Sequence, residues 1–302
     1  MSNKLTQNTK KLKQLSAKLT SFFDLQPEED LKEVTNKILS SSIIEANIKE
    51  TIKIYNRKIY IFKYPSDGLS IIGFINYAPE QGDKLMMILR GGNRKFGILN
   101  PASDLTCYKD YAIIGTLYRG GLSEGVDEFG GADVKDAKNL LSFVPTLEKK
   151  LNAKLMNRTK FLIGGSRGGM QIFLFLQRYP KMQTYFHKVV GLSGLYDLTL
   201  LQNDRPEMIK MFKRDFGLTN DNAKEWFIYR SPINHINQIS SKLPILLIEG
   251  TRDIRAAKDD GKNMFAQLQA QGKDVTFKEF IAEHCLSDMP ERMDVIAKWL
   301  ES

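Results

Sequence analysis

The sequence predicts an α/β protein with a mostly parallel sheet covered by helices on both faces. Short apolar runs alternate with stretches of helical spacing along most of the chain. Glycines stand just after several of these runs, at 91–92, 120–121 and 164–165. Because parallel strands end at one edge of a sheet, polar residues that follow the runs should gather at that edge.

Residues 1–45 are expected to form a helical N-terminal extension, and residues 46–302 the main domain. The apolar residues of the first helix share one face, and they are Leu5, Leu12, Leu15, Leu19 and Phe22. Lysines surround them, and no acidic residue occurs before Asp24. Such a basic amphipathic helix either packs on the main domain or binds a membrane surface or a partner groove. We expect packing, followed by a second helix from Pro27 to about Leu39.

From Ile48 onward the pattern changes to strands. The first three, at 51–55, 58–63 and 70–77, are separated by turns at 56–57 and 66–68, which predicts an antiparallel start. Further strands are expected at 85–89, 111–118, 161–163, 189–192, 245–248 and 275–281. Helices are expected at 134–151, after residue 166, and at 255–271 and 289–300.

Composition limits the classes of protein to consider. The chain has 302 residues, of which 42% are hydrophobic, enough for one large domain and an appendage. The net charge of +9 is mild, and no basic block contains interleaved aromatics, so nucleic-acid binding is not expected. There is no apolar leader or bilayer-length apolar run, and the two cysteines, Cys107 and Cys285, suggest no disulfide framework. These features predict a cytoplasmic protein.

Ser166 is the predicted nucleophile. It is the centre of Gly164-Gly165-Ser166-Arg167-Gly168, which matches G-x-S-x-G between an apolar run and a helical segment that ends at Pro180. In this context the serine occupies a strained turn that exposes its Oγ, and the helix start directs backbone N–H groups toward a developing oxyanion. The alternative is a glycine-rich turn with an incidental serine, which fits the context less well.

A serine hydroxyl needs a base to accept its proton, and the chain has three histidines. His187 precedes a strand and should lie at the opposite end of the sheet. His235 lies in a polar connection and is expected to be structural. His284 follows the last predicted strand, at the edge that carries Ser166. His284 is therefore the predicted base.

Asp253 is the predicted acid that orients this histidine. It follows the strand at 245–248 and lies between the serine and the histidine in chain order. Two alternatives remain open. Asp253 is also a suitable N-cap for the helix at 255–271, and Asp197 is a second candidate for the acid.

The oxyanion hole requires hydrogen-bond donors near the serine. One is predicted to be the backbone N–H of Arg167. The other should come from the loop after the strand at 85–89, in which Arg90, Gly91 and Gly92 are the candidates. The sequence does not select the donating atom.

An acidic stretch follows at Glu124, Asp127, Glu128, Asp133 and Asp136. Asp133 and Asp136 suit the start of a helix, and Asp127 with Glu128 is expected to anchor Arg119 or Arg167. The alternative is binding of a peptide amino terminus. These acids lack histidine companions, so neither a metal nor another cofactor is expected.

Several motifs together resemble a known family. They are Leu89-Arg90-Gly91-Gly92-Asn93, Tyr118-Arg119-Gly120-Gly121, Asp127–Val134, Gly165–Met170 and Arg230-Ser231-Pro232. The resemblance is to the prolyl oligopeptidase-like (serine peptidase) branch of the α/β-hydrolase superfamily, over about residues 48–302. It implies an α/β-hydrolase fold with an eight-stranded, mostly parallel sheet. It also implies that Ser166, Asp253 and His284 are nucleophile, acid and base. Arg90 stands where peptidase members often have a tyrosine whose hydroxyl completes the oxyanion hole.

These observations predict a serine hydrolase that acts on a small molecule or short peptide through an acyl-enzyme. A peptidase-like activity is the main hypothesis. A carboxylesterase is the first alternative, and a non-catalytic partner-binding module on the same fold is the second. Since residues 1–45 supply none of the predicted chemistry, a chain starting near Ile44 is expected to keep its activity on small esters. The substrate and the oligomeric state stay open.

Overall fold

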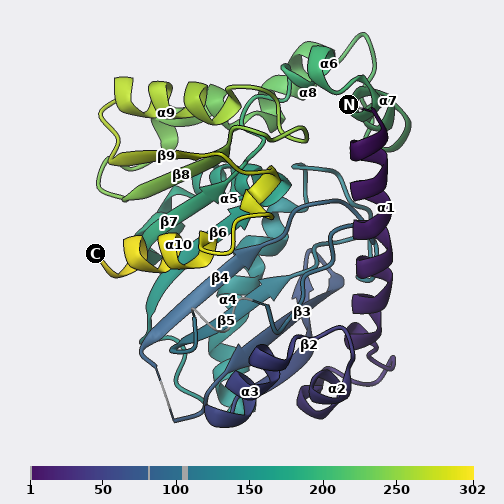
Figure 1. The fold of residues 1–302 in the computed structure, drawn as a ribbon, viewed down its shortest axis with the longest axis vertical. Coiled ribbons are helices and arrows are strands. Elements are labelled where there is room, and N and C mark those ends of the chain that lie inside the picture. Colours follow the sequence, from purple (N-terminus) through teal and green to yellow (C-terminus); the bar gives the residue numbers. More distant parts are fainter. Residues whose placement is uncertain (1, 81, 104–107) are drawn as a thin grey trace.

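The computed structural model describes residues 2–80, 82–103 and 108–302. Its centre is a nine-stranded sheet in the order β1-β2-β3-β5-β4-β6-β7-β8-β9 (Figure 1). The strands are β1 (Leu31–Glu33), β2 (Lys58–Ser66), β3 (Leu69–Tyr77), β4 (Lys84–Leu89), β5 (Tyr111–Thr116), β6 (Thr159–Gly165), β7 (Phe186–Leu192), β8 (Ile245–Gly250) and β9 (Val275–Phe280). Pairing is antiparallel from β1 through β3 to β5 and parallel from β5 to β9. The predicted mostly parallel sheet is confirmed.

Helices cover both faces of this sheet. One face carries α4 (Val134–Leu151), α5 (Arg167–Arg178), α6 (Leu201–Asp204), α7 (Pro206–Asp215), α8 (Ala223–Arg230), η2 (Pro180–Tyr185), η3 (Pro232–Gln238) and α9 (Asp260–Ala270). The other carries α1 (Ser2–Leu19), η1 (Thr20–Phe23), α2 (Thr35–Ser40), α3 (Ala46–Ile54), η4 (His284–Leu286) and α10 (Arg292–Glu301). Helix α1, purple in Figure 1, runs along one side of the molecule from α7 to α2.

The central strands explain why the apolar runs are continuous. All six residues of β8 are buried. Ile245 and Leu247 belong to the core on one face of the sheet, whereas Leu246 and Ile248 belong to the core on the other. Because successive side chains of a strand point to opposite faces, a strand covered on both sides needs an unbroken apolar run.

The N-terminal segment differs from its prediction, because it is not wholly helical. Strand β1 lies where the second helix was expected, and its Leu31 pairs with Phe62 of β2. With β1 the sheet has nine strands, one more than the eight that the family resemblance implied. The acids that suggested a helix start instead form a turn, in which Glu29 N–H donates to the Gln26 carbonyl at 3.0 Å. Pairing with the open edge of β2 thus outweighs the local helix signal.

Residues 51–55 were predicted as a strand and belong mostly to helix α3 instead. Ile48 and Ile52 are both buried, one helical turn apart. The β-branched residues of this stretch suggested a strand, but their spacing of four residues is helical. The helix predicted at 255–271 also begins later, at Asp260.

The structure also bears on the two cysteines and on the expectation that no helix crosses a membrane. Cys107 lies outside the described residues, and Cys285 is a free, partly buried cysteine. In the part of the chain that the structure describes, no helix combines the length and the apolar character needed to cross a membrane.

The N-terminal extension shares its core with the main domain, which leads to a first prediction. Phe23 is 3% exposed and packs edge-to-face on Phe74 of β3, with ring centroids 6.4 Å apart. Phe23→Ala should therefore lower the free energy of unfolding by about 3–5 kcal/mol, measured by urea denaturation. Leu15→Ala is the control, because Leu15 is 45% exposed and the change should stay within about 0.5 kcal/mol. Equal effects would show that the extension does not share the core.

Candidate functional site

Ser166 lies between the end of β6 and the start of α5, at the carboxyl edge of the sheet. Its backbone has φ 58° and ψ −126°, a strained conformation for a residue with a side chain. The Ser166 N–H donates to the Leu192 carbonyl at 2.8 Å, and the Ser166 carbonyl accepts from Gly169 N–H at 2.9 Å. These bonds hold the serine in the sharp turn that the motif predicted.

The glycines around Ser166 are required by close packing. A Cβ on Gly168 would lie 2.0 Å from the Leu89 carbonyl oxygen, and one on Gly164 would lie 2.5 Å from the Gly168 oxygen. A Cβ on Gly165 would lie 2.9 Å from Cys285 Sγ. The G-x-S-x-G spacing thus lets α5 approach the ends of β4 and β6 closely enough to expose the serine.

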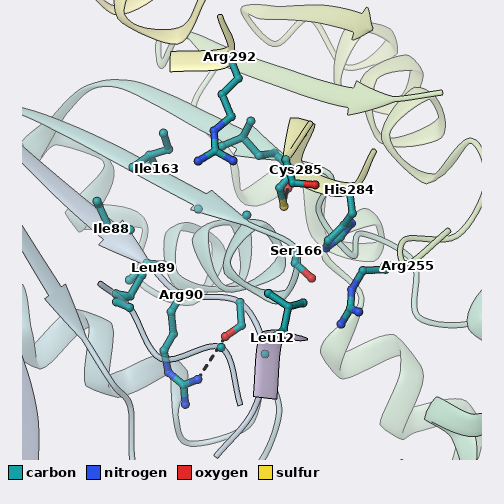
Figure 2. Close-up of a pocket in the computed structure, with 18 of the residues that line it drawn as sticks. Leu12, Ile88, Leu89, Arg90, Ile163, Ser166, Arg255, His284, Cys285 and Arg292 are labelled. Carbon is teal, nitrogen blue, oxygen red and sulfur yellow. Dashed lines mark hydrogen bonds between the residues drawn. The ribbon is translucent and has the colours of Figure 1, made fainter. Parts of the chain in front are cut away.

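His284 and Asp253 come together at the same edge. His284 Nδ1 lies 2.7 Å from Asp253 Oδ2, and the two side chains are only 14% and 5% exposed. The bond at Nδ1 leaves Nε2 for the serine. His284 and Ser166 line one cavity, and Figure 2 shows the imidazole ring next to the Ser166 side chain. The three residues predicted from separate segments therefore share one site.

The other oxygen of Asp253 holds its own loop. Oδ1 accepts from the N–H groups of Arg255 at 2.7 Å and Ala256 at 3.1 Å. The helix that Asp253 was considered to cap starts instead at Asp260, with Asp259 at the N-cap position. The Asp253 carboxylate is consequently fixed by the loop on one side and by the imidazole on the other.

The competing candidates make different contacts. Asp197 Oδ1 accepts from the N–H and the hydroxyl of Thr199, at 2.9 and 2.6 Å, so it stabilises a local turn. His235 Nε2 lies 3.0 Å from the Ile228 carbonyl oxygen. His187 is at the start of β7, at the end of the sheet away from Ser166. The contacts described here for Asp197 and His235 involve neither Asp253 nor His284, and His187 lies at the other end of the sheet.

The local charges alter the pKa values of the pair. Burial disfavours the imidazolium of His284, but Cys285 and Asp253 favour it more strongly and raise its pKa to about 9. Burial also disfavours the Asp253 carboxylate, yet its hydrogen bond to His284 keeps its pKa below the usual value. Because the pKa of His284 is raised, the fraction of neutral imidazole, the form that can accept a proton, increases as pH rises above neutral.

The loop after β4 lies against Ser166. A Cβ on Gly91 would lie 3.2 Å from Ser166 Cβ, and Gly92 has φ +67°, in the left-handed region. The buried Arg90 guanidinium donates to the carbonyls of Leu117, Phe96 and Arg94, at 3.0, 2.9 and 2.8 Å. Arg90 thus folds the loop with its side chain, while the loop backbone at Gly91 faces the serine.

The Arg167 side chain connects this loop to the turn at Ser166. Its guanidinium bonds both oxygens of Asp127, at 2.7 and 2.8 Å, and also Asp133 at 2.7 Å and the Gly92 carbonyl at 2.9 Å. Asp127 Oδ2 accepts in addition from Arg94 N–H at 2.8 Å. Burial opposes the Asp127 charge, but Arg167 outweighs it and lowers the pKa of Asp127 to about 2.

The acidic stretch therefore has structural partners. Asp127 was expected to anchor an arginine and binds Arg167, whereas Asp136 binds Arg119 at 2.7 Å. Glu128 accepts instead from Ala132 N–H at 2.9 Å. Within the described ranges, no cluster of three or more His, Cys, Asp or Glu side chains is arranged to hold a metal ion.

Two cavities meet at Ser166, with volumes of about 490 and 660 Å³. Helix α1 lines both: Lys11 and Leu12 face the first, and Thr9, Lys10 and Lys13 face the second. The sequence placed none of the predicted chemistry in the extension, and it did not predict that α1 lines both cavities. Arg255, which lines both cavities, was also missed, although it follows the predicted acid by only two residues.

This chain is similar in sequence to known proteins. A model of the prolyl oligopeptidase family matches residues 130–301. The uncharacterized peptidase YtmA of Bacillus subtilis (strain 168) is 28% identical over 199 residues, which are 65% of this chain and 74% of that protein.

Solved structures of the α/β-hydrolase fold are also similar. The acylaminoacyl peptidase of Pyrococcus horikoshii matches 80% of this chain with a TM-score of 0.65 and 20% identity. This chain spans only 40% of that peptidase's length. The Pyrococcus furiosus esterase Pf2001 matches 83% of this chain and 93% of its own, with a TM-score of 0.61 and 17% identity. At these identities the likeness shows the α/β-hydrolase fold that the sequence predicted.

The buried pair of Asp127 and Arg167 leads to a pH-dependent prediction. Asp127→Asn should lower the free energy of unfolding by about 3 kcal/mol at pH 7, because the Arg167 charge loses a buried partner. The folded-state pKa of Asp127 lies below the value of about 3.9 for an aspartate in an unfolded chain, so its stabilising effect is present above that value. The difference from the wild type should shrink as pH falls from about 4 to about 2.

Urea denaturation at several pH values measures this difference. The exposed Asp221 offers the matched control, since Asp221→Asn should have almost no effect at any pH. A difference between wild type and Asp127→Asn that stays constant down to pH 2 would contradict the assigned ion pair.

Proposed function

Because this chain belongs to the prolyl oligopeptidase family and is a serine hydrolase, we propose that it forms an acyl-enzyme on Ser166, with His284 as base and Asp253 as orienting acid. The substrate is a small molecule or short peptide with an amide or ester bond. The proposal rests above all on one contact, the 2.7 Å hydrogen bond between Asp253 and His284, which lines the same cavity as Ser166.

In the first half of the reaction, His284 Nε2 accepts the proton of the Ser166 hydroxyl. Oγ forms a bond to the substrate's carbonyl carbon, and the π electrons of the carbonyl move onto its oxygen. The backbone N–H groups of Arg167 and Gly91 stabilise this oxyanion, since both residues adjoin the serine. The Asp253 carboxylate stabilises the imidazolium.

In the second half, the carbonyl re-forms and the C–N or C–O bond to the leaving group breaks. His284 gives its proton to the leaving group, and the acyl group stays on Ser166. A water molecule then loses a proton to His284 and attacks the acyl carbon. Collapse of the second oxyanion returns the proton to Ser166 Oγ and releases the acid.

A peptidase-like activity is the primary proposal, because the family and YtmA are described as peptidases. Two observations support carboxylesterase activity as the second candidate. Esterase Pf2001 matches this chain over 93% of its own length. In addition, the Arg90 guanidinium is bonded to backbone carbonyls, so it does not replace the tyrosine hydroxyl of the peptidase members. An ester, with its better leaving group, depends less on a third oxyanion donor.

Labelling with a fluorophosphonate tests the nucleophile. The wild type should be labelled at Ser166 and should hydrolyse members of a panel of small esters and aminoacyl or prolyl amides. Ser166→Ala should abolish labelling and turnover while the melting curve stays close to that of the wild type. Labelling of the variant at another serine would refute the assignment.

The acid can be tested separately through Asp253→Asn. Asparagine keeps the bonds to Arg255 and Ala256 N–H but removes the charge, so kcat/KM on an activated ester should fall by about two to four orders of magnitude. The fold should be retained. Asp197→Asn is the matched control and should leave kcat/KM nearly unchanged. Normal turnover in Asp253→Asn would exclude it as the acid.

The pH profile gives an independent readout. Only neutral His284 accepts the Ser166 proton, and its pKa is raised to about 9, so kcat/KM of the wild type should rise from pH 6 to about pH 9. Asp253 contributes to this raised pKa. In Asp253→Asn the residual activity should therefore titrate at lower pH than in the wild type. An unchanged midpoint would show that the carboxylate does not act on His284.

A further inference from the structure

The larger cavity beside Ser166 has a basic wall that the proposed mechanism does not use. It is lined by residues from α1, from the loop after β4, from α7 and from the loop that carries Asp253. Its basic residues are Lys10, Lys13, Arg94, Arg167, Arg205, Arg214 and Arg255, and its acidic residues are Glu207 and Asp215.

Several of these charges are neutralised by neighbours. Arg167 is paired with buried acids, as described above. Arg205 pairs with Glu207. Asp215 pairs with Arg214 at 2.6 Å and with Arg94 at 3.7 Å, so it serves two cations.

Three of the cations form no direct ion pair in the part of the chain that the structure describes. Over the described ranges, no carboxylate lies within ion-pair distance of Lys10, Lys13 or Arg255. The two lysines are exposed on successive turns of the same face of α1. They therefore add positive charge at the rim of the cavity, while Arg255 adds it close to the serine.

Arg255 lines both cavities, as Ser166 does. Its guanidinium lies 5.6 Å from the centre of the Phe96 ring and makes one long hydrogen bond, 3.4 Å, to the Thr9 hydroxyl. Figure 2 shows the side chain extending from its loop into the space near Ser166. Partial burial and Arg205 lower the pKa of Arg255, although Cys285, Asp253 and Glu207 act in the opposite direction, so an anion in the cavity would further stabilise its charge.

The rest of the lining is apolar. Phe96, Phe129, Leu195, Met208 and Met211 contribute to the same cavity. An occupant that suits this wall has a hydrophobic body and a negative group that reaches the three cations. A carboxylate matches the planar fork of a guanidinium, which can donate two parallel hydrogen bonds to it.

We propose that this cavity is a substrate subsite for a carboxylate, and that the preferred substrate carries an apolar group with a carboxylate on one side of the scissile bond. The inference rests on the proposed function, because it assigns a substrate class to the same Ser166 site. Helix α1 then takes part in selectivity, since it supplies Lys10 and Lys13.

Two pairs of esters test the proposal on the full chain. The acyl arm compares 4-nitrophenyl hexanoate with mono-4-nitrophenyl adipate, which differ by a terminal carboxylate. The leaving-group arm compares methyl 3-acetoxybenzoate with 3-acetoxybenzoate. In one arm the anionic ester should have a kcat/KM about tenfold higher than its neutral counterpart, and added NaCl should reduce this ratio. The arm that responds identifies the side of the scissile bond that enters the cavity.

Charge variants identify the residues responsible. Arg255→Gln and the double variant Lys10→Gln/Lys13→Gln should each lower the anionic-to-neutral ratio toward one. Lys18→Gln is the matched control, because Lys18 is exposed on the same helix and lines neither cavity. It removes one charge and should keep the wild-type ratio.

The outcomes separate the two hypotheses. Turnover of the neutral esters without preference for the anion in either arm would overturn the subsite and leave the serine hydrolase mechanism intact. A preference that survives in Arg255→Gln and in the double lysine variant would also overturn it. Absence of turnover for all four esters, together with absence of fluorophosphonate labelling, would refute the proposed function itself.

Discussion

The candidate site depends on the buried ion pairs of Arg167 with Asp127 and Asp133. Arg167 directly follows the serine, and its side chain is 1% exposed, as in a structural core. The same Asp127 carboxylate bonds the Arg94 backbone in the loop after β4. Two segments far apart in the sequence are thus held in fixed relation, and the Arg167 N–H keeps its position beside the serine. A buried guanidinium is tolerated here because two carboxylates compensate its desolvation.

Parallel topology explains how much of the site the sequence could predict. Each strand end delivers its following residues to one edge, so Ser166, Asp253 and His284 could be placed together from chain order and apolar runs alone. The structure has His284 Nδ1 bonded to Asp253 at that edge. The elbow could be predicted because its glycines reflect local packing, and local constraints are visible in a short motif.

The failures at β1 and at the position of α1 have a common physical origin, which is tertiary contact. Strand β1 forms because β2 offers an unpaired edge, and three residues are too few to carry a strand pattern of their own. The apolar face of α1 predicted that the helix packs on the main domain, but it did not predict which part of that domain it contacts. That position depends on contacts such as Gly97 N–H donating to Ser16 Oγ at 3.0 Å, which no periodicity encodes. The residues of α1 that line the cavities could therefore not be predicted from the sequence.

The way in which acids and bases are paired in the core determines which charges remain at the cavity. Over the whole chain the net charge of +9 is a mild excess. Three acids near the site, Asp127, Asp133 and Asp136, are buried and bonded to Arg167 and Arg119, so they form no ion pair with Lys10, Lys13 or Arg255 of the cavity wall. The acids that hold the turn at Ser166 are thereby buried, and Lys10, Lys13 and Arg255 of the larger cavity keep their positive charge available for an anion. Part of the modest global excess is therefore concentrated in cations next to Ser166, and because Lys10 and Lys13 are exposed, their attraction for an anion is screened by salt.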